Sequence, residues 1–210
     1  MLLPPSELPG FFGPIDIYLF DQLLKGRLTP GMRILDAGCG SGRNLPYFLR
    51  HGFDVCAVDE TPNAVDQVRA LAADLAPGLP PANFRAEALE ALSFSDEDFD
   101  AVIASAVLHF ARDRGHFEAM VRELWRVLRP GGLFFARLAS SIGLESRVEP
   151  RGDGRYHLPD GTDRFLVDEE LLRGLTAALG ASAVEPLKTV NVENQRCMTT
   201  WCLRKDARRG

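Results

Sequence analysis

Three alternating glycines follow an acidic residue at the end of an apolar run, in the sequence Ile34-Leu-Asp36-Ala-Gly38-Cys-Gly40-Ser-Gly42. Glycines permit positive φ angles and let the backbone approach a ligand without a Cβ clash. In an open α/β sheet, ligands bind at the carboxyl ends of the strands, which is where a turn after a strand lies. The stretch therefore predicts a cofactor-binding turn between the first strand and the following helix.

The spacing of this turn separates two kinds of cofactor. A dinucleotide-binding turn needs the pattern Gly-x-Gly-x-x-Gly/Ala, and Arg43 occupies the last of those positions here. The carboxylate of Asp36 would oppose a pyrophosphate, whereas it suits a ligand that carries an ammonium group. The pattern favours a cofactor with an amino-acid part, and a nicotinamide-dependent oxidoreductase is the less favoured alternative.

Further acidic positions follow the next expected strand ends. Asp59 lies 23 residues after Asp36, which matches the ~20-residue offset of an acid that binds ribose hydroxyls. Its neighbour Glu60 belongs to the same predicted cofactor-binding set. Glu87, followed by Ala88, lies near the same edge, where it could reach an adenine amino group. A ribose occurs in dinucleotides and in adenosyl cofactors alike, so Asp59 supports either kind.

Short apolar runs alternate with helical patterns along the chain, which is typical of a parallel sheet covered by helices. Strands are expected at residues 32–36, 54–59, 83–88, 99–105 and 133–138. Thr61 is expected to cap a helix with its hydroxyl, with Pro62 at the first helical position. That helix carries an apolar stripe up to Leu75, and a second stripe lies between His116 and Leu128.

Two regions depart from simple alternation. Residues 140–167 are polar and rich in glycine, arginine and aspartate, and a Pro159-Asp-Gly161 turn predicts a small hairpin within them. Near the end of the chain, residues 183–192 and 196–203 are expected to form two strands paired antiparallel. The chain has no internal repeat or interdomain linker, so residues 1–210 are expected to form a single domain.

From Ile34 to about Leu138 the chain resembles the class I S-adenosylmethionine-dependent methyltransferases, through the glycine turn and the Leu128-Arg-Pro-Gly-Gly132 sequence before the fifth strand. The resemblance implies an α/β, Rossmann-like fold, with a seven-stranded, mostly parallel sheet, helices on both faces and a C-terminal antiparallel hairpin. It implies S-adenosyl-L-methionine as the cofactor and S-adenosyl-L-homocysteine as its product. Gly42-Arg-Asn44 is also similar to the small tellurite-resistance type of methyltransferase.

The resemblance also assigns parts of the cofactor to positions in this chain. The three glycines of the turn would line the methionine part, and Asp59 would bind the ribose diol. Glu87 and Ala88 correspond to the adenine edge. Ser105 corresponds to the end of the fourth strand, beside the sulfonium.

The acceptor side of the site is less well defined. His109 is the one candidate general base near the cofactor, and a packed core or rim histidine is the favoured alternative. Residues 140–167 follow the active edge of the fifth strand, so they could face the acceptor or form a solvated loop. Residues 1–30, a helical segment rich in aromatic residues, could close as a lid with Tyr18 against the cofactor, or dock on the sheet.

The net charge and the sequence after the fourth strand restrict the kinds of acceptor that are expected. The formal net charge is −5, and the sequence has no basic stripe that would attract a nucleic acid. Methyltransferases that resemble those acting on exocyclic or amide nitrogens carry Asp/Asn-Pro-Pro-Tyr/Phe after the fourth strand, where this chain has Ser105-Ala-Val-Leu108. These observations favour a small-molecule acceptor.

The longest apolar run, residues 101–111, is shorter than the about 20 residues of a bilayer span. The first residues lack the charged and apolar parts of a secretory signal, so a cytoplasmic location without a membrane is expected. The cysteines and histidines have no zinc-type spacing, so no metal is expected. The sequence leaves the oligomeric state open. A non-catalytic S-adenosylmethionine-binding protein is the second alternative.

Overall fold

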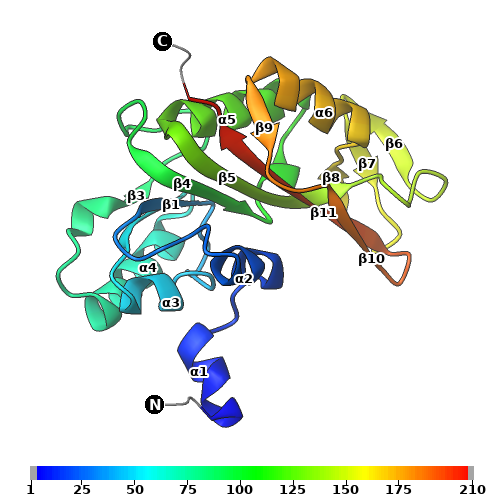
Figure 1. Ribbon diagram of the computed structural model, residues 1–210. Coiled ribbons are helices and arrows are strands. Elements are labelled where there is room, and N and C mark those ends of the chain that lie inside the picture. Colours follow the sequence, from blue (N-terminus) through cyan, green and yellow to red (C-terminus); the bar gives the residue numbers. More distant parts are fainter. Residues whose placement is uncertain (1–3, 208–210) are drawn as a thin grey trace.

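The computed structural model describes residues 4–207, so residues 1–3 and 208–210 of the expected domain lie outside the described part. The strands of the central sheet are β1 (Arg33–Ala37), β2 (Asp54–Asp59), β3 (Phe84–Ala86), β4 (Phe99–Ser105), β5 (Leu128–Ser140), β9 (Ala181–Ala183), β10 (Lys188–Val192) and β11 (Arg196–Lys205). Seven of them follow in the order β10-β11-β5-β4-β1-β2-β3, and β9 pairs with another part of β11. β1 to β5 are parallel, and β11 runs antiparallel to its neighbours, which confirms the expected fold class (Figure 1).

Helices cover both faces of this sheet (Figure 1). The helices are α1 (Leu8–Phe12), α2 (Ile17–Leu24), α3 (Pro46–Arg50), α4 (Pro62–Leu75), α5 (Arg114–Val127) and α6 (Glu169–Ala178), with 3-10 turns η1 (Pro5–Glu7), η2 (Pro81–Asn83) and η3 (Leu108–Phe110). Apolar residues of α2, α3 and α4 pack on one face, and those of α5 and α6 pack on the other. None of the helices within residues 4–207 combines the length and apolar character that crossing a bilayer requires.

Alternate residues of the buried strands supply the two halves of the core. In β2, Val55 and Ala57 pack with α4, whereas Cys56 and Val58 pack on the α5 side. This division follows because successive side chains of a strand point to opposite faces, and a parallel sheet is covered on both. Full burial of one such aliphatic side chain stabilises the fold by about 1.5–3 kcal/mol.

The observed strands test the expected boundaries one by one. β2 and β4 have the bounds that the sequence predicts, whereas β1 covers residues 33–37 instead of 32–36. β5 is longer than expected, because Leu128 already pairs with Phe99 before an irregular register around Pro130-Gly131-Gly132. β3 ends at Ala86 instead of Ala88, and the carboxylate of the next residue, Glu87, accepts from the Ser93 amide (2.9 Å) in the following loop.

The starts of two helices test the prediction further. Helix α4 starts at Pro62, but the hydroxyl of Thr61 makes no capping hydrogen bond, so that part of the prediction is wrong. The Thr61 amide instead donates to Oδ1 of Asp59 (2.9 Å), which draws the chain toward the end of β2. Helix α5 starts two residues early because Asp113 caps it, accepting from the His116 amide (2.7 Å).

The segment 140–167 forms a small antiparallel sheet of β6 (Glu149–Gly152), β7 (Arg155–His157) and β8 (Asp163–Phe165). The β7–β8 hairpin is the one that the sequence predicts, whereas β6 is an additional strand. Phe165 stacks on Phe117 of α5, with ring centroids 4.8 Å apart. This contact attaches the small sheet to the main core.

The C-terminal antiparallel pair is present, but its first strand is broken. The sequence predicts one strand over 183–192, and the structure has β9 and β10 with Glu185-Pro186 between them. A proline lacks the amide that a ladder needs, which explains the interruption. Both pieces pair with β11.

Gly154→Ala should destabilise the protein more than Gly161→Ala. Both glycines have a φ of +81°, and a Cβ at Gly154 would also overlap the Phe165 ring, whereas one at Gly161 meets nothing within 4 Å. In urea titrations we expect losses of about 1 kcal/mol for Gly161→Ala and about 2–4 kcal/mol for Gly154→Ala. Equal losses would contradict the idea that Phe165 holds the small sheet in place.

Candidate functional site

The glycine turn after β1 is tied to the end of β2 by backbone hydrogen bonds. The amides of Gly38 and Cys39 both donate to the carbonyl of Val58 (2.8 and 3.0 Å). The amide of Gly40 donates to Oδ2 of Asp59 (2.9 Å). These bonds bring the predicted turn and the predicted ribose-binding acid into one site at the carboxyl edge of the sheet.

All three glycines of the turn have positive φ angles, but they differ in the space around them. Gly38 (φ +71°) leaves no room for a side chain, because a Cβ would overlap Val107 in the turn after β4. Gly42 (φ +80°) is also close-packed, since its Cβ would lie 3.0 Å from Val68 Cγ2. Gly40 (φ +51°) has no atom within 4 Å of a Cβ position, so this part of the turn is open to a ligand.

Asp36 is the residue before the last of β1, just ahead of this turn, and is only 1% exposed. Its Oδ2 is buried and accepts no hydrogen bond from the described residues. Burial raises the pKa of Asp36 to about 7, with Arg43 opposing the rise and Asp59 adding to it. A buried carboxyl group without a partner is costly, and a ligand ammonium group would satisfy it.

The remaining residues predicted to bind the cofactor differ in their exposure and in how far their polar groups are already hydrogen-bonded. Asp59 accepts one backbone amide at each oxygen, which leaves lone pairs for a further donor. Glu60 is exposed, and Ala88 is half-buried. The amide of Glu87 donates to the carbonyl of Asp59 (3.1 Å), but its carboxylate binds the amide and hydroxyl of Ser93. Glu87 therefore lies beside the end of β2, with its charge directed at the following loop.

A buried carboxylate that the sequence analysis missed links the N-terminal segment to two strand ends. Oδ1 of Asp16 accepts from the Tyr18 amide (2.9 Å) at the start of α2. Its Oδ2 lies 3.0 Å from Nη1 of Arg137 and 3.6 Å from Nη2 of Arg43. The Ser105 hydroxyl donates to the same oxygen (3.4 Å). One carboxylate thus contacts α2, the glycine turn, β4 and β5.

Two further bonds fix this arrangement. The side-chain oxygen of Asn44 accepts from the Asp16 amide (3.0 Å), and Nη2 of Arg43 donates to the Ser105 hydroxyl (3.1 Å). The guanidinium of Arg137 lies over the Tyr18 ring, 5.2 Å from its centroid. An acid directly before the apolar pattern of α2 is a helix-capping signal, which could have singled out Asp16.

His109 lies in η3, next to the end of β4, and is buried. Its Nδ1 accepts from the Ala139 amide (3.4 Å), which assigns the proton of the neutral ring to Nε2. Burial, followed by the charges of Arg164 and Arg196, lowers the pKa of His109 to about 4. At neutral pH the ring is uncharged and presents a donor at Nε2.

A cavity of about 350 Å³ opens between the end of β4, the small antiparallel sheet and the start of β11. Its charged and titratable lining residues are Arg43, His109, Arg137, Asp160, Arg164 and Arg196. The cavity adjoins Ser105 through Ala106 and Arg43. It is the candidate acceptor pocket on geometric grounds, since it shares residues with the site around the glycine turn.

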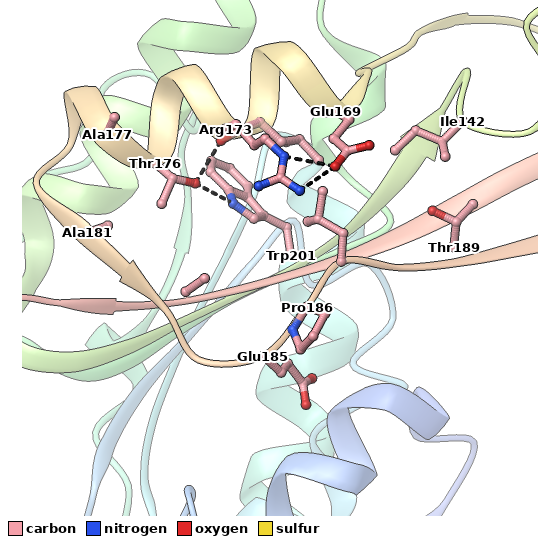
Figure 2. Close-up of a pocket in the computed structure, with 13 residues that line it drawn as sticks. Ile142, Glu169, Arg173, Thr176, Ala177, Ala181, Glu185, Pro186, Thr189 and Trp201 are labelled. Atoms are coloured by element: carbon pink, nitrogen blue, oxygen red, sulfur yellow. Dashed lines mark hydrogen bonds and ion pairs between the residues drawn. The ribbon is translucent and has the colours of Figure 1, made fainter.

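A second cavity, of about 500 Å³, lies between α6 and the strands β9 to β11 (Figure 2). There the Trp201 indole donates to the Thr176 hydroxyl (3.0 Å), and Arg173 pairs with Glu169 of the same helix. No residue predicted to bind the cofactor lines it. Although it is the larger of the two, we do not assign it to the acceptor.

Asp16→Ala and Asp16→Asn together separate two roles of this carboxylate. The asparagine can still cap α2, but it cannot neutralise two arginines, so Asp16→Asn should lower the unfolding free energy by about 1–3 kcal/mol. Asp16→Ala should cost about 1 kcal/mol more because the cap is also lost. Urea denaturation measures both. An Asp16→Asn variant as stable as the wild type would mean that the ionic link contributes nothing.

Comparisons with known proteins agree with this geometry. Residues 35–136 match the family described as a methyltransferase domain. The chain is 36% identical over 168 residues to a ubiquinone biosynthesis O-methyltransferase from Methylocella silvestris. That match covers 75% of this chain and 63% of the relative, so the chain spans less than two thirds of the relative's length.

Solved structures share the fold. An S-adenosylmethionine-dependent methyltransferase from Methanosarcina mazei has a TM-score of 0.71 at 21% identity, covering 88% of this chain and 97% of that one. A Burkholderia thailandensis 1,6-didemethyltoxoflavin-N1-methyltransferase, solved with 1,6-didemethyltoxoflavin and S-adenosylhomocysteine bound, has a TM-score of 0.63 at 21% identity, covering 99% and 92%. With its glycine turn and strand order, the chain belongs to the class I S-adenosylmethionine-dependent methyltransferase superfamily.

Proposed function

We propose that this protein transfers a methyl group from S-adenosyl-L-methionine to a small-molecule acceptor. The observation that carries the proposal is Asp36, a buried carboxyl group with an unsatisfied oxygen beside an open glycine turn. The methionine part of this cofactor carries an ammonium group that would satisfy it. The superfamily to which the chain belongs supports the same cofactor.

In this proposal, different residues around the turn bind different parts of the cofactor. Asp36 binds the ammonium group, and the glycine turn accommodates the methionine backbone, with open space at Gly40. Asp59 binds the ribose diol with the lone pairs that the backbone leaves free. Glu87 and Ala88 border the adenine.

Three further residues contribute at the edges of this site. Glu60 is exposed beside Asp59, so it adds negative charge at the rim. Ser105 lies beside the sulfonium, where Arg43 and Asp16 hold its hydroxyl. Tyr18 borders the site from the N-terminal segment, which we propose acts as the lid.

The protein has a limited chemical task in this reaction. When bound, the cofactor supplies an electrophilic methyl group on a sulfonium, so the chain needs to align the acceptor and exclude water. His109 is unsuited to act as a base at neutral pH, given a pKa of about 4 and a proton on Nε2. We infer that the acceptor reacts without help from this histidine, which serves as a hydrogen-bond donor in the pocket.

Methyl-labelled S-adenosyl-L-methionine tests the proposed reaction directly. We expect label to move from the cofactor into the small-molecule fraction of a cell extract, and not into its RNA, DNA or protein. Asp36→Asn should reduce this transfer strongly, whereas Arg173→Gln, on the remote helix α6, should not. Cofactor binding without transfer to any fraction would instead favour the non-catalytic binding protein, and oxidation of NADH would favour the oxidoreductase.

The affinity for S-adenosyl-L-homocysteine should depend on pH. An ammonium ligand prefers ionised Asp36, whose pKa of about 7 means that the carboxyl group holds its proton in more acidic solution. Between about pH 5.5 and pH 7 the affinity should rise by up to about tenfold per unit, then fall again as the ligand amino group deprotonates near pH 8. Calorimetric titrations at several pH values measure this profile.

Asp36→Asn is the matched control for that profile. The variant should bind more weakly near neutral pH and lose the acidic limb, because it has no proton to release. A wild-type affinity that stays constant from about pH 5.5 to pH 7, or the same acidic limb in Asp36→Asn, would contradict the assignment of the ammonium group to Asp36.

A further inference from the structure

The candidate acceptor pocket is strongly cationic, although the whole chain has a net charge of −5. Four arginines line it, and Asp160 is the carboxylate among its lining residues. Asp160 is itself occupied, since its Oδ1 accepts from the amide and hydroxyl of Thr162 (3.0 and 2.6 Å). A concentration of one charge in a cavity selects ligands of the opposite charge.

The four arginines are not equally neutralised. Arg43 and Arg137 share the buried carboxylate of Asp16, which lies behind the end of the pocket that adjoins Ser105. One negative charge is divided between two cations there. The pair is therefore held in place by the protein itself and needs no ligand to position it.

Arg164 and Arg196, from β8 and the start of β11, are held more loosely. Arg164 donates to the carbonyl of Asp163 (2.8 Å) and lies over the Phe110 ring, and neither contact neutralises its charge. Arg196 lies 3.8 Å from Asp160, beyond hydrogen-bond distance. Both guanidinium groups lie close enough to His109 for their charges to lower its pKa, in addition to the larger effect of its burial.

We propose that the acceptor is a small organic anion, whose carboxylate or phosphate group binds to Arg164 and Arg196. This inference rests on the proposed function, because it takes the cavity beside Ser105 as the acceptor pocket. Guanidinium groups bind such anions through paired N–H donors, and these bonds are stronger than bonds between neutral groups. The anionic group would lie at the β8–β11 end, and the methyl-accepting atom would point toward Ser105.

The rest of the lining fits an acceptor with an apolar body. Leu158, Ala139 and Met198 line the same cavity and belong to one apolar cluster. The volume of about 350 Å³ lies at the small end of the range for ligand pockets, about 300–1,000 Å³. A compact carboxylic acid or phosphate monoester therefore matches the pocket better than a neutral or cationic molecule does.

Three probes of one shape test the charge preference: benzoate, phenyl phosphate and benzamide. Each is titrated calorimetrically at low ionic strength, with and without S-adenosyl-L-homocysteine. We expect at least one of the two anions to bind about tenfold more tightly than benzamide, and their order tells whether the pocket prefers a carboxylate or a phosphate. Arg164→Gln and Arg196→Gln should each lower the affinity for the preferred anion by about tenfold, because one charged hydrogen-bond donor is lost.

Arg173→Gln is the matched control, because this exposed arginine pairs with Glu169 outside the pocket and its loss should leave anion binding unchanged. Equal binding of benzamide and the anions, no binding of either anion at millimolar concentration, or full affinity in both pocket variants would overturn the inference. Titration of S-adenosyl-L-homocysteine into the same samples separates the two claims. An anion preference without binding of this ligand would support the pocket and count against the proposed function, whereas binding of this ligand without an anion preference would overturn the inference alone.

Discussion

The close approach of the glycine turn to the ends of β2 and β4 is the constraint on which the rest of the site depends. Val107 occupies the space where a side chain at residue 38 would lie, and the Gly40 amide binds Asp59. The same packing buries Asp36 and raises its pKa to about 7. Because the folded state binds this proton more tightly than the unfolded state, the contribution of Asp36 to stability is largest in acid and is lost as the pH rises toward 7. The buried acid thus costs stability near neutral pH, which is expected of a group kept for a ligand.

Asp16 imposes a second constraint at the carboxyl edge of the sheet. A single buried carboxylate caps α2 and contacts Arg43, Arg137 and Ser105. The N-terminal segment is therefore bound to the ends of β4 and β5 by charge as well as by apolar packing. Sharing one carboxylate between two arginines leaves an excess of positive charge there, which adds to the charges of Arg164 and Arg196 in the adjoining pocket.

Local signals explain which parts were predictable from the sequence. The Asp36 to Gly42 turn, the bounds of β2 and β4 and the β7–β8 hairpin each depend on residues adjacent in the chain. The role of Asp16 depends on Arg137, 121 residues away, and no local pattern reveals that contact. The β6 strand has no apolar alternation. The break between β9 and β10 falls at Pro186, a local signal that the expected strand over 183–192 did not take into account. The capping role expected of Thr61 was wrong: the Ala64 amide donates to the Thr61 carbonyl (3.0 Å), and the Thr61 hydroxyl makes no capping hydrogen bond.

Calorimetric titration with S-adenosyl-L-methionine, S-adenosyl-L-homocysteine and NADH tests the central claim most directly, namely that the glycine turn and its two acids form a pocket for an adenosyl amino acid. The account predicts micromolar binding of the first two ligands and none of NADH, in agreement with Arg43 at the position where a dinucleotide-binding turn needs a small residue. Binding of NADH without binding of either adenosyl ligand would contradict it.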